Sequence, residues 1–141
     1  MLIFFAGKGE PIGSAAGFVQ SRATGQVLAL APGLEISPEA TLQVPTRVAR
    51  FETVVMAQDD RTWESGRVEF PEIGSHLDVD TVVPGRFGVR EDGFSTGSIS
   101  WRVTGGSGHF EGATGIVTGN FVGHPAGTFT DHQLFKLVLP D

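Results

Sequence analysis

The stretch that decides the fold reads VTGGSGHFEGATGIVTGNF and runs from Val103 to Phe121. Runs rich in Val, Ile and Thr, which prefer the pleated surface of a strand, flank a link crowded with glycine. Glycine permits positive φ, so the pattern predicts a strand, a tight reversal and a second strand. The one aromatic residue of the link, Phe110, is expected to plug one end of a barrel. We expect positive φ at the first three glycines and sharp corners at the last two: Gly105, Gly106 and Gly108, then Gly112 and Gly115.

The rest of the chain shows the same pattern, with short segments rich in strand-forming residues separated by glycines and prolines. The 20 glycines of the 141 residues are about twice the usual share and would punctuate many short strands. Strands are predicted at residues 2–6, 17–22, 27–31, 47–57, 66–70, 75–83, 94–104, 113–121 and 128–139. The run 47–57 also fits helical spacing, but its β-branched residues favour a strand. Turns are predicted at 58–61, at Pro84-Gly85 and at the Asp-Gly pair of 91–93, and a loop at 33–39.

The last predicted strand favours closure of the sheet. Its second half alternates Leu134, Lys136 and Val138 with an apolar set, Phe135, Leu137 and Leu139, which should face the core. A terminal strand this apolar is usually paired on both sides. We therefore expect one domain, 1–141, folded as an all-β antiparallel barrel of about eight strands.

Composition and charge argue against several classes of function. The formal net charge is −6 and no segment clusters Lys and Arg, which argues against nucleic acid and against an anionic membrane surface. The chain has no cysteine, so disulfides and thiolate catalysis are excluded, and a reducing cytoplasm is expected. The apolar start of the chain lacks a basic segment and is read as a strand rather than a signal peptide. The high apolar fraction is compatible with a homo-oligomer.

The segment from Gly105 to Gly115 resembles the G-G-[ST]-G-x-[FY]-x-G-A-x-G signature of small barrels of the allene oxide cyclase and dirigent type. The resemblance covers roughly residues 93–139. It implies a barrel whose lumen holds a small hydrophobic metabolite and controls its cyclisation or isomerisation without a cofactor. The chain departs from the plant members because it has no Tyr and no Cys.

Three ionisable residues are candidates for catalysis. Asp131 shares a strand face with Phe129 and Phe135, where an unpaired acid would be costly to bury, so it is a candidate acid at the barrel mouth. The alternative is an ordinary polar residue at an exposed strand start. Glu52 lies on a strand face with Arg50, and a cross-strand ion pair is the alternative. His76 shares a face with Asp78 and Asp80, which suits a metal or an imidazole–carboxylate pair, or simply a solvated outer face.

Large apolar side chains are candidates for substrate binding. They are Trp101, Phe51, Phe110, Phe121, Phe135 and Trp63. The four histidines match no compact metal pattern, and neither a Gly-x-Ser-x-Gly elbow nor a phosphate loop is present, so no metal and no cofactor are expected.

Three functions stay open at this point. The first is a cofactor-free cyclase or isomerase acting on a hydrophobic metabolite. The second is a lipocalin-like carrier that releases its ligand unchanged. The third is a structural module with a filled barrel, which would lack a cavity on the ~300 Å³ scale.

Overall fold

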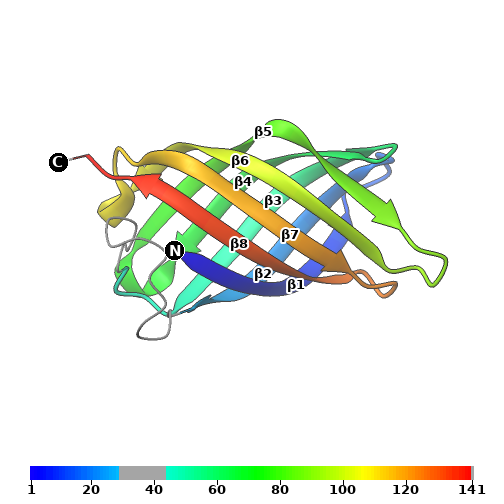
Figure 1. The fold of residues 1–141 in the computed structure, drawn as a ribbon, viewed down its shortest axis with the longest axis horizontal. Coiled ribbons are helices and arrows are strands. Elements are labelled where there is room, and N and C mark those ends of the chain that lie inside the picture. Colours follow the sequence, from blue (N-terminus) through cyan, green and yellow to red (C-terminus); the bar gives the residue numbers. More distant parts are fainter. Residues whose placement is uncertain (29–43, 141) are drawn as a thin grey trace.

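The chain forms a closed barrel of eight antiparallel strands with almost no helix (Figure 1). The computed structural model describes residues 1–28 and 44–140. Each strand pairs with the next, and β1 pairs with β8 to close the barrel. The strands are β1 (Leu2–Pro11), β2 (Phe18–Leu28), β3 (Val48–Gln58), β4 (Arg61–Phe70), β5 (Ser75–Val89), β6 (Ser95–Ser107), β7 (Thr114–Gly123) and β8 (Thr128–Val138). This confirms the predicted all-β barrel.

Strand alternation divides each strand into an inner and an outer face. Along β8, Asp131, Gln133 and Phe135 are buried while the residues between them are exposed. The buried apolar side chains of the described residues form a hydrophobic core inside the barrel. Its largest fully buried apolar side chains are Trp101, Phe5, Phe70, Phe110, Ile3 and Leu77.

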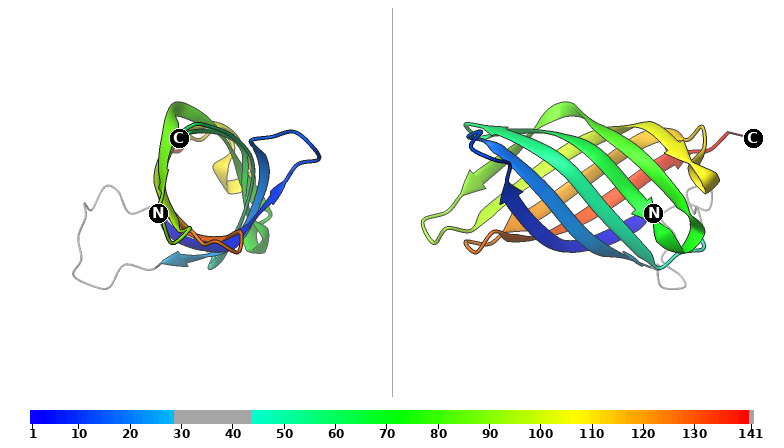
Figure 2. Two further views of the ribbon diagram at one scale, coloured as in Figure 1. Left: turned by 90° about the vertical axis from the view of Figure 1, so that its right-hand side faces the viewer. Right: turned by 180° about the vertical axis from the view of Figure 1, so that it is seen from behind.

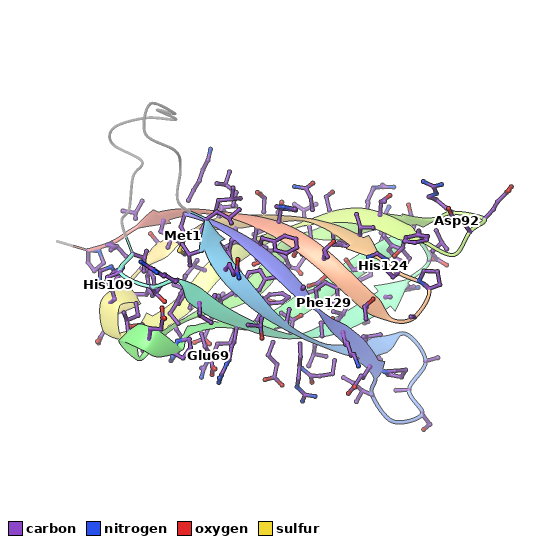
Figure 3. All side chains as sticks on the ribbon, turned by 90° about the horizontal axis from the view of Figure 1, so that it is seen from below. Met1, Glu69, Asp92, His109, His124 and Phe129 are labelled. Carbon is purple, nitrogen blue, oxygen red and sulfur yellow. The ribbon has the colours of Figure 1, made fainter. Side chains whose placement is uncertain are left out.

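The two ends of the barrel differ. At one end, the short 3-10 helices η2 (Pro71–Ile73) and η3 (Gly108–Phe110) connect neighbouring strands. Figure 2 shows η3 lying across this end of the ring of strands. Phe110 is fully buried there, with its ring 4.8 Å from that of Phe70, so the expected aromatic plug is present. Met1 and His109 mark this end in Figure 3, and His124 and Asp92 mark the other.

Two predicted strands are one. Residues 18–28 form the continuous strand β2, so the predicted break between 22 and 27 was wrong. Gly25 lies inside the strand, where a Cβ atom would come 2.4 Å from the ring of Phe5. This glycine makes room for an aromatic ring rather than a turn. Residues 29–31 of the predicted strand, and the predicted loop at 33–39, lie outside the described residues.

The predicted turn at Pro84-Gly85 was also wrong, because β5 continues through it to Val89. The pairing of β5 with β6 shifts register between Val83 and Arg86, so the proline lies at a bulge. A bulge is one of the few places in a sheet that tolerate proline, since proline has no backbone N–H to donate. The predicted strand at 66–70 was too short, because β4 begins at Arg61.

The glycines of the Val103–Phe121 segment act in two ways. Gly108, Gly112 and Gly115 have positive φ, of 59°, 71° and 152°. Gly105 and Gly106 do not, which corrects the expectation for both. At Gly106 a Cβ atom would come 2.3 Å from the backbone oxygen of Phe110, so the close approach of η3 requires glycine there.

The helical parts of the described chain are short 3-10 turns, and no helix there is long and apolar enough to cross a membrane.

Replacing the aromatic plug should destabilise the barrel. We expect Phe110→Ala to lower the free energy of unfolding by about 3–5 kcal/mol, because it removes a fully buried ring and leaves a cavity against Phe70. The exposed neighbour provides the control: Glu111→Ala should change stability by no more than about 0.5 kcal/mol. Urea unfolding of the three proteins measures both values. Equal stability of the two variants would contradict the role of Phe110 as a plug.

Candidate functional site

A cavity of about 320 Å³ lies in the lumen toward the end opposite Phe110. The inner faces of the surrounding strands contribute both aromatic and carboxyl side chains to it. Its lining residues include five aromatics and two acids: Phe51, Phe87, Trp101, Phe121, Phe129, Glu64 and Asp131. A cavity of this size can hold a small organic molecule.

Asp131 is the first acid of this cavity. It lies on the inner face of β8 and is only 3% exposed. Its Oδ2 accepts a hydrogen bond of 2.8 Å from Gln133 Nε2, while Oδ1 has no partner among the described residues. Burial raises the pKa of the Asp131 carboxyl, and hydrogen bonds from Gln133 and the Asn120 backbone oppose this only in part.

Glu64 is the second acid, on β4. It pairs with Val55 of β3, whose side chain also lines the cavity. The backbone around Glu64 is fixed by Thr81: the Glu64 N–H donates to Thr81 Oγ1 at 2.6 Å, and this hydroxyl donates to the Glu64 carbonyl at 2.9 Å. This contact lies where the pairing of β4 with β5 shifts register, between Thr62 and Ser65.

The environment of Glu64 keeps its carboxyl protonated at neutral pH. Burial, and then the charge of Asp131, raise the pKa of Glu64 to about 8. A small part of Glu64 is still exposed because it faces the cavity, although protein surrounds it. The lumen therefore holds two carboxyls of different character. Glu64 is neutral and can donate a proton, while Asp131 ionises more readily.

Trp101 forms a wall of the cavity. Its ring lies 5.8 Å from that of Phe51 in an edge-to-face arrangement. It passes over Gly119, where a Cβ atom would come 2.8 Å from the indole and 3.1 Å from Asp131 Oδ1. Trp101 Nε1 is buried without a hydrogen-bond partner among the described residues. The absence of a side chain at Gly119 thus brings an indole and a carboxylate together in the lumen.

The predicted site residues divide into three groups. Asp131, Trp101, Phe51 and Phe121 all line the cavity. Phe110 and Phe135 are buried in the core but are not among the lining residues. Glu52, His76 and Trp63 lie on the outer face, so the structure does not bring these three candidates to the cavity.

Outward residues meet polar partners on neighbouring strands. Glu52 accepts from Arg22 Nε at 3.1 Å, which is the ion-pair alternative. His76 Nδ1 lies 2.7 Å from Ser107 Oγ, and its Nε2 lies 3.5 Å from Asp78 Oδ2, but Asp78 is also held by Arg67 at 2.7 Å. Trp63 pairs in register with Met56 on the outside.

A larger open groove, of about 790 Å³, crosses the outer faces of β1 to β4. Its charged side chains alternate in sign and belong to neighbouring strands, for example Arg22 and Glu52. The lining charges of this groove lie on the outer faces of the strands, and some of them, such as Arg22 and Glu52, form exposed ion pairs. The lumen cavity holds buried carboxyls instead, so we place the candidate site in the lumen.

Sequence reasoning missed Glu64 and Thr62. The signal was present, since both continue the inner alternation of Val68 and Phe70 toward the start of β4. The predicted strand began only at residue 66, so Thr62 and Glu64 lay outside it and were not assigned to its inner face.

Metal binding has little support in the part of the chain that the structure describes. No group of three or more His, Asp or Glu side chains there is arranged to hold an ion.

Fold and site together define the protein as a closed eight-stranded barrel with a cavity containing two carboxyl groups. No protein-family model, curated protein or solved structure matches the chain. The resemblance of residues 105–115 to allene oxide cyclase and dirigent barrels therefore stays a prediction.

The raised pKa of Glu64 predicts how stability depends on pH. Between the ordinary glutamate pKa of 4.5 and about 8, the folded protein binds more protons than the unfolded chain, so stability falls as pH rises through this window. Glu64→Gln cannot ionise. We expect its stability relative to wild type to increase by on the order of a few kcal/mol from about pH 5 to about pH 9.

Urea unfolding at several pH values tests this, with Glu69→Gln as the control. Glu69 lies on the same strand but is exposed on the outer face, so this variant should follow the pH dependence of wild type. Parallel curves for wild type and Glu64→Gln would contradict a buried neutral Glu64.

Proposed function

We propose that the protein binds a small hydrophobic metabolite in the barrel lumen and promotes its cofactor-free cyclisation or isomerisation. The observation that carries the proposal is the pair of buried carboxyl groups, Glu64 and Asp131, in an aromatic-walled cavity. Carboxyls whose environments separate their protonation states are typical of acid–base sites. The resemblance of residues 105–115 to small-molecule cyclase barrels supports the same proposed function.

In the proposed reaction, Glu64 is the proton donor. Its neutral carboxyl transfers a proton to an unsaturated or oxygen-bearing group of the ligand, which then carries positive charge. The Asp131 carboxylate and the aromatic faces stabilise that charge while the ligand rearranges. The Glu64 carboxylate then removes a proton from another position of the ligand. Atoms balance, because the product is an isomer of the substrate and Glu64 is protonated again.

The walls of the cavity would control the path of the rearrangement. Trp101 packs edge to face against Phe51, and both lie on paired strands rather than on loops. Rigid aromatic walls hold a flexible molecule in one folded shape, which lowers the entropic part of the barrier. The buried plug at Phe110 closes the opposite end against water.

A cytoplasmic location is part of the same proposal and rests on the cysteine-free sequence. The lipocalin-like carrier remains the alternative function and is an outcome of the test below.

A thermal-shift screen with terpenoid, polyketide-like and fatty-acid compounds tests ligand binding. A ligand that binds only the folded state should raise the melting temperature by several degrees at concentrations well above its Kd. Product analysis after incubation with the compound that binds then tests turnover. We expect Glu64→Gln to lower turnover by about 10²–10⁴-fold while it still binds, and Glu69→Gln to retain activity.

The pH dependence of turnover provides a second check. Activity should fall as pH rises through about 8, where Glu64 loses its proton. A compound that binds but is recovered unchanged would favour the carrier. A screen without any shift would contradict lumen binding itself.

A further inference from the structure

Basic and acidic side chains are distributed differently between the inside and the outside of the barrel. All ten lysines and arginines of the chain are exposed. The titratable side chains that line the cavity are Glu64 from β4, Asp131 from β8 and His124 from the β7–β8 link. Among the described residues, therefore, no lysine or arginine lines the cavity, and the basic groups near the two carboxyls are two histidines: His124 at the mouth and His132, whose charge lowers the pKa of Asp131.

Polar atoms in the cavity also lack partners. Asp131 Oδ1 and Thr62 Oγ1 are buried without a hydrogen bond within the described residues, although both residues line the cavity. A buried acceptor without a donor is costly, and an uncompensated carboxylate more so. A ligand that brings positive charge and N–H donors would relieve both penalties, while a ligand with a carboxylate would increase them.

The walls match such a ligand. Five aromatic rings line a cavity of about 320 Å³ that also contains the two acids. The negative face of an aromatic ring attracts ammonium groups, most strongly where water is excluded. Aromatic rings together with carboxylates are a combination that recognises organic cations.

We propose that the lumen is a site for organic cations, so that its ligand is a hydrophobic molecule with a protonated or quaternary nitrogen, and that carboxylic acids are excluded. This rests on the proposed function only in that the lumen binds a ligand. It goes further by fixing the charge of that ligand. The same features would stabilise the positive charge of the proposed reaction, so non-reacting amines would act as inhibitors.

Three probes with the same alkyl chain test the inference: octyltrimethylammonium, 1-octanol and octanoate. Calorimetric titration of the full chain at neutral pH should give at least about tenfold tighter binding of octyltrimethylammonium than of 1-octanol, and no binding of octanoate. Between about pH 6 and about pH 9, affinity for octyltrimethylammonium should rise as Glu64 ionises, because this probe does not itself titrate.

A double variant, Glu64→Gln with Asp131→Asn, should bind octyltrimethylammonium about tenfold more weakly than wild type does. Its affinity for 1-octanol should stay within about threefold of the wild-type value. The matched control, Glu52→Gln with Glu69→Gln, removes the same number of acids from the outer face and should bind as wild type does. Circular dichroism and thermal unfolding confirm that each variant is folded. If the double variant fails to fold, the pH dependence of wild type decides the question.

The possible failures are distinguishable. Equal or tighter binding of 1-octanol or octanoate would overturn the cation inference and leave lumen binding intact. Failure of all three probes to bind would contradict the proposed function as well.

Discussion

The pairing of β1 with β8 is the constraint on which the other features of the structure depend. Leu2 to Lys8 of β1 lie opposite Leu134 to Thr128 of β8, so the first and last strands leave no open edge. Closure gives every strand one face toward a shared interior. Once β8 is fixed between β1 and β7, its alternation places Phe129, Asp131 and Phe135 inside together. The acid of the site is therefore buried by the same pairing that completes the barrel.

Side-chain size along the axis determines where the lumen is empty. An eight-stranded barrel is only just wide enough for its interior to be filled by side chains. Near one end, the fully buried rings of Phe70 and Phe110 pack against each other in the interior. Toward the other, the cavity lining includes Gly9, Gly123 and Gly127. Glycine thus has two roles inside this barrel: it admits a ring, as at Gly25 and Gly119, or it lines the open cavity.

The sequence predicted the architecture better than the site, because alternation is a local property while closure is not. Asp131 was predictable, since Phe129 and Phe135 mark its face of β8 as the inner one. Phe51 and Glu52 could not both face the lumen, because adjacent residues of a strand point to opposite sides. The same holds for His76 and its buried neighbour Leu77. Residue type made Glu52 and His76 candidates, whereas the two-residue period of the strands places both on the outer face.

Trp63 and Glu64 reverse the usual arrangement, in which an apolar side chain faces inward and an acid faces water. This reversal is the strongest argument for a functional lumen. The register with β3 turns the tryptophan outward beside Met56 and the glutamate inward beside Val55. Hydrophobic burial alone would favour the opposite arrangement, since it would cover an indole and hydrate a carboxylate. Sequences depart from consistent patterning mainly where function requires it. Burial and the charge of Asp131 raise the pKa of Glu64 to about 8, so this arrangement places a neutral carboxyl and Asp131 in the same aromatic-walled cavity.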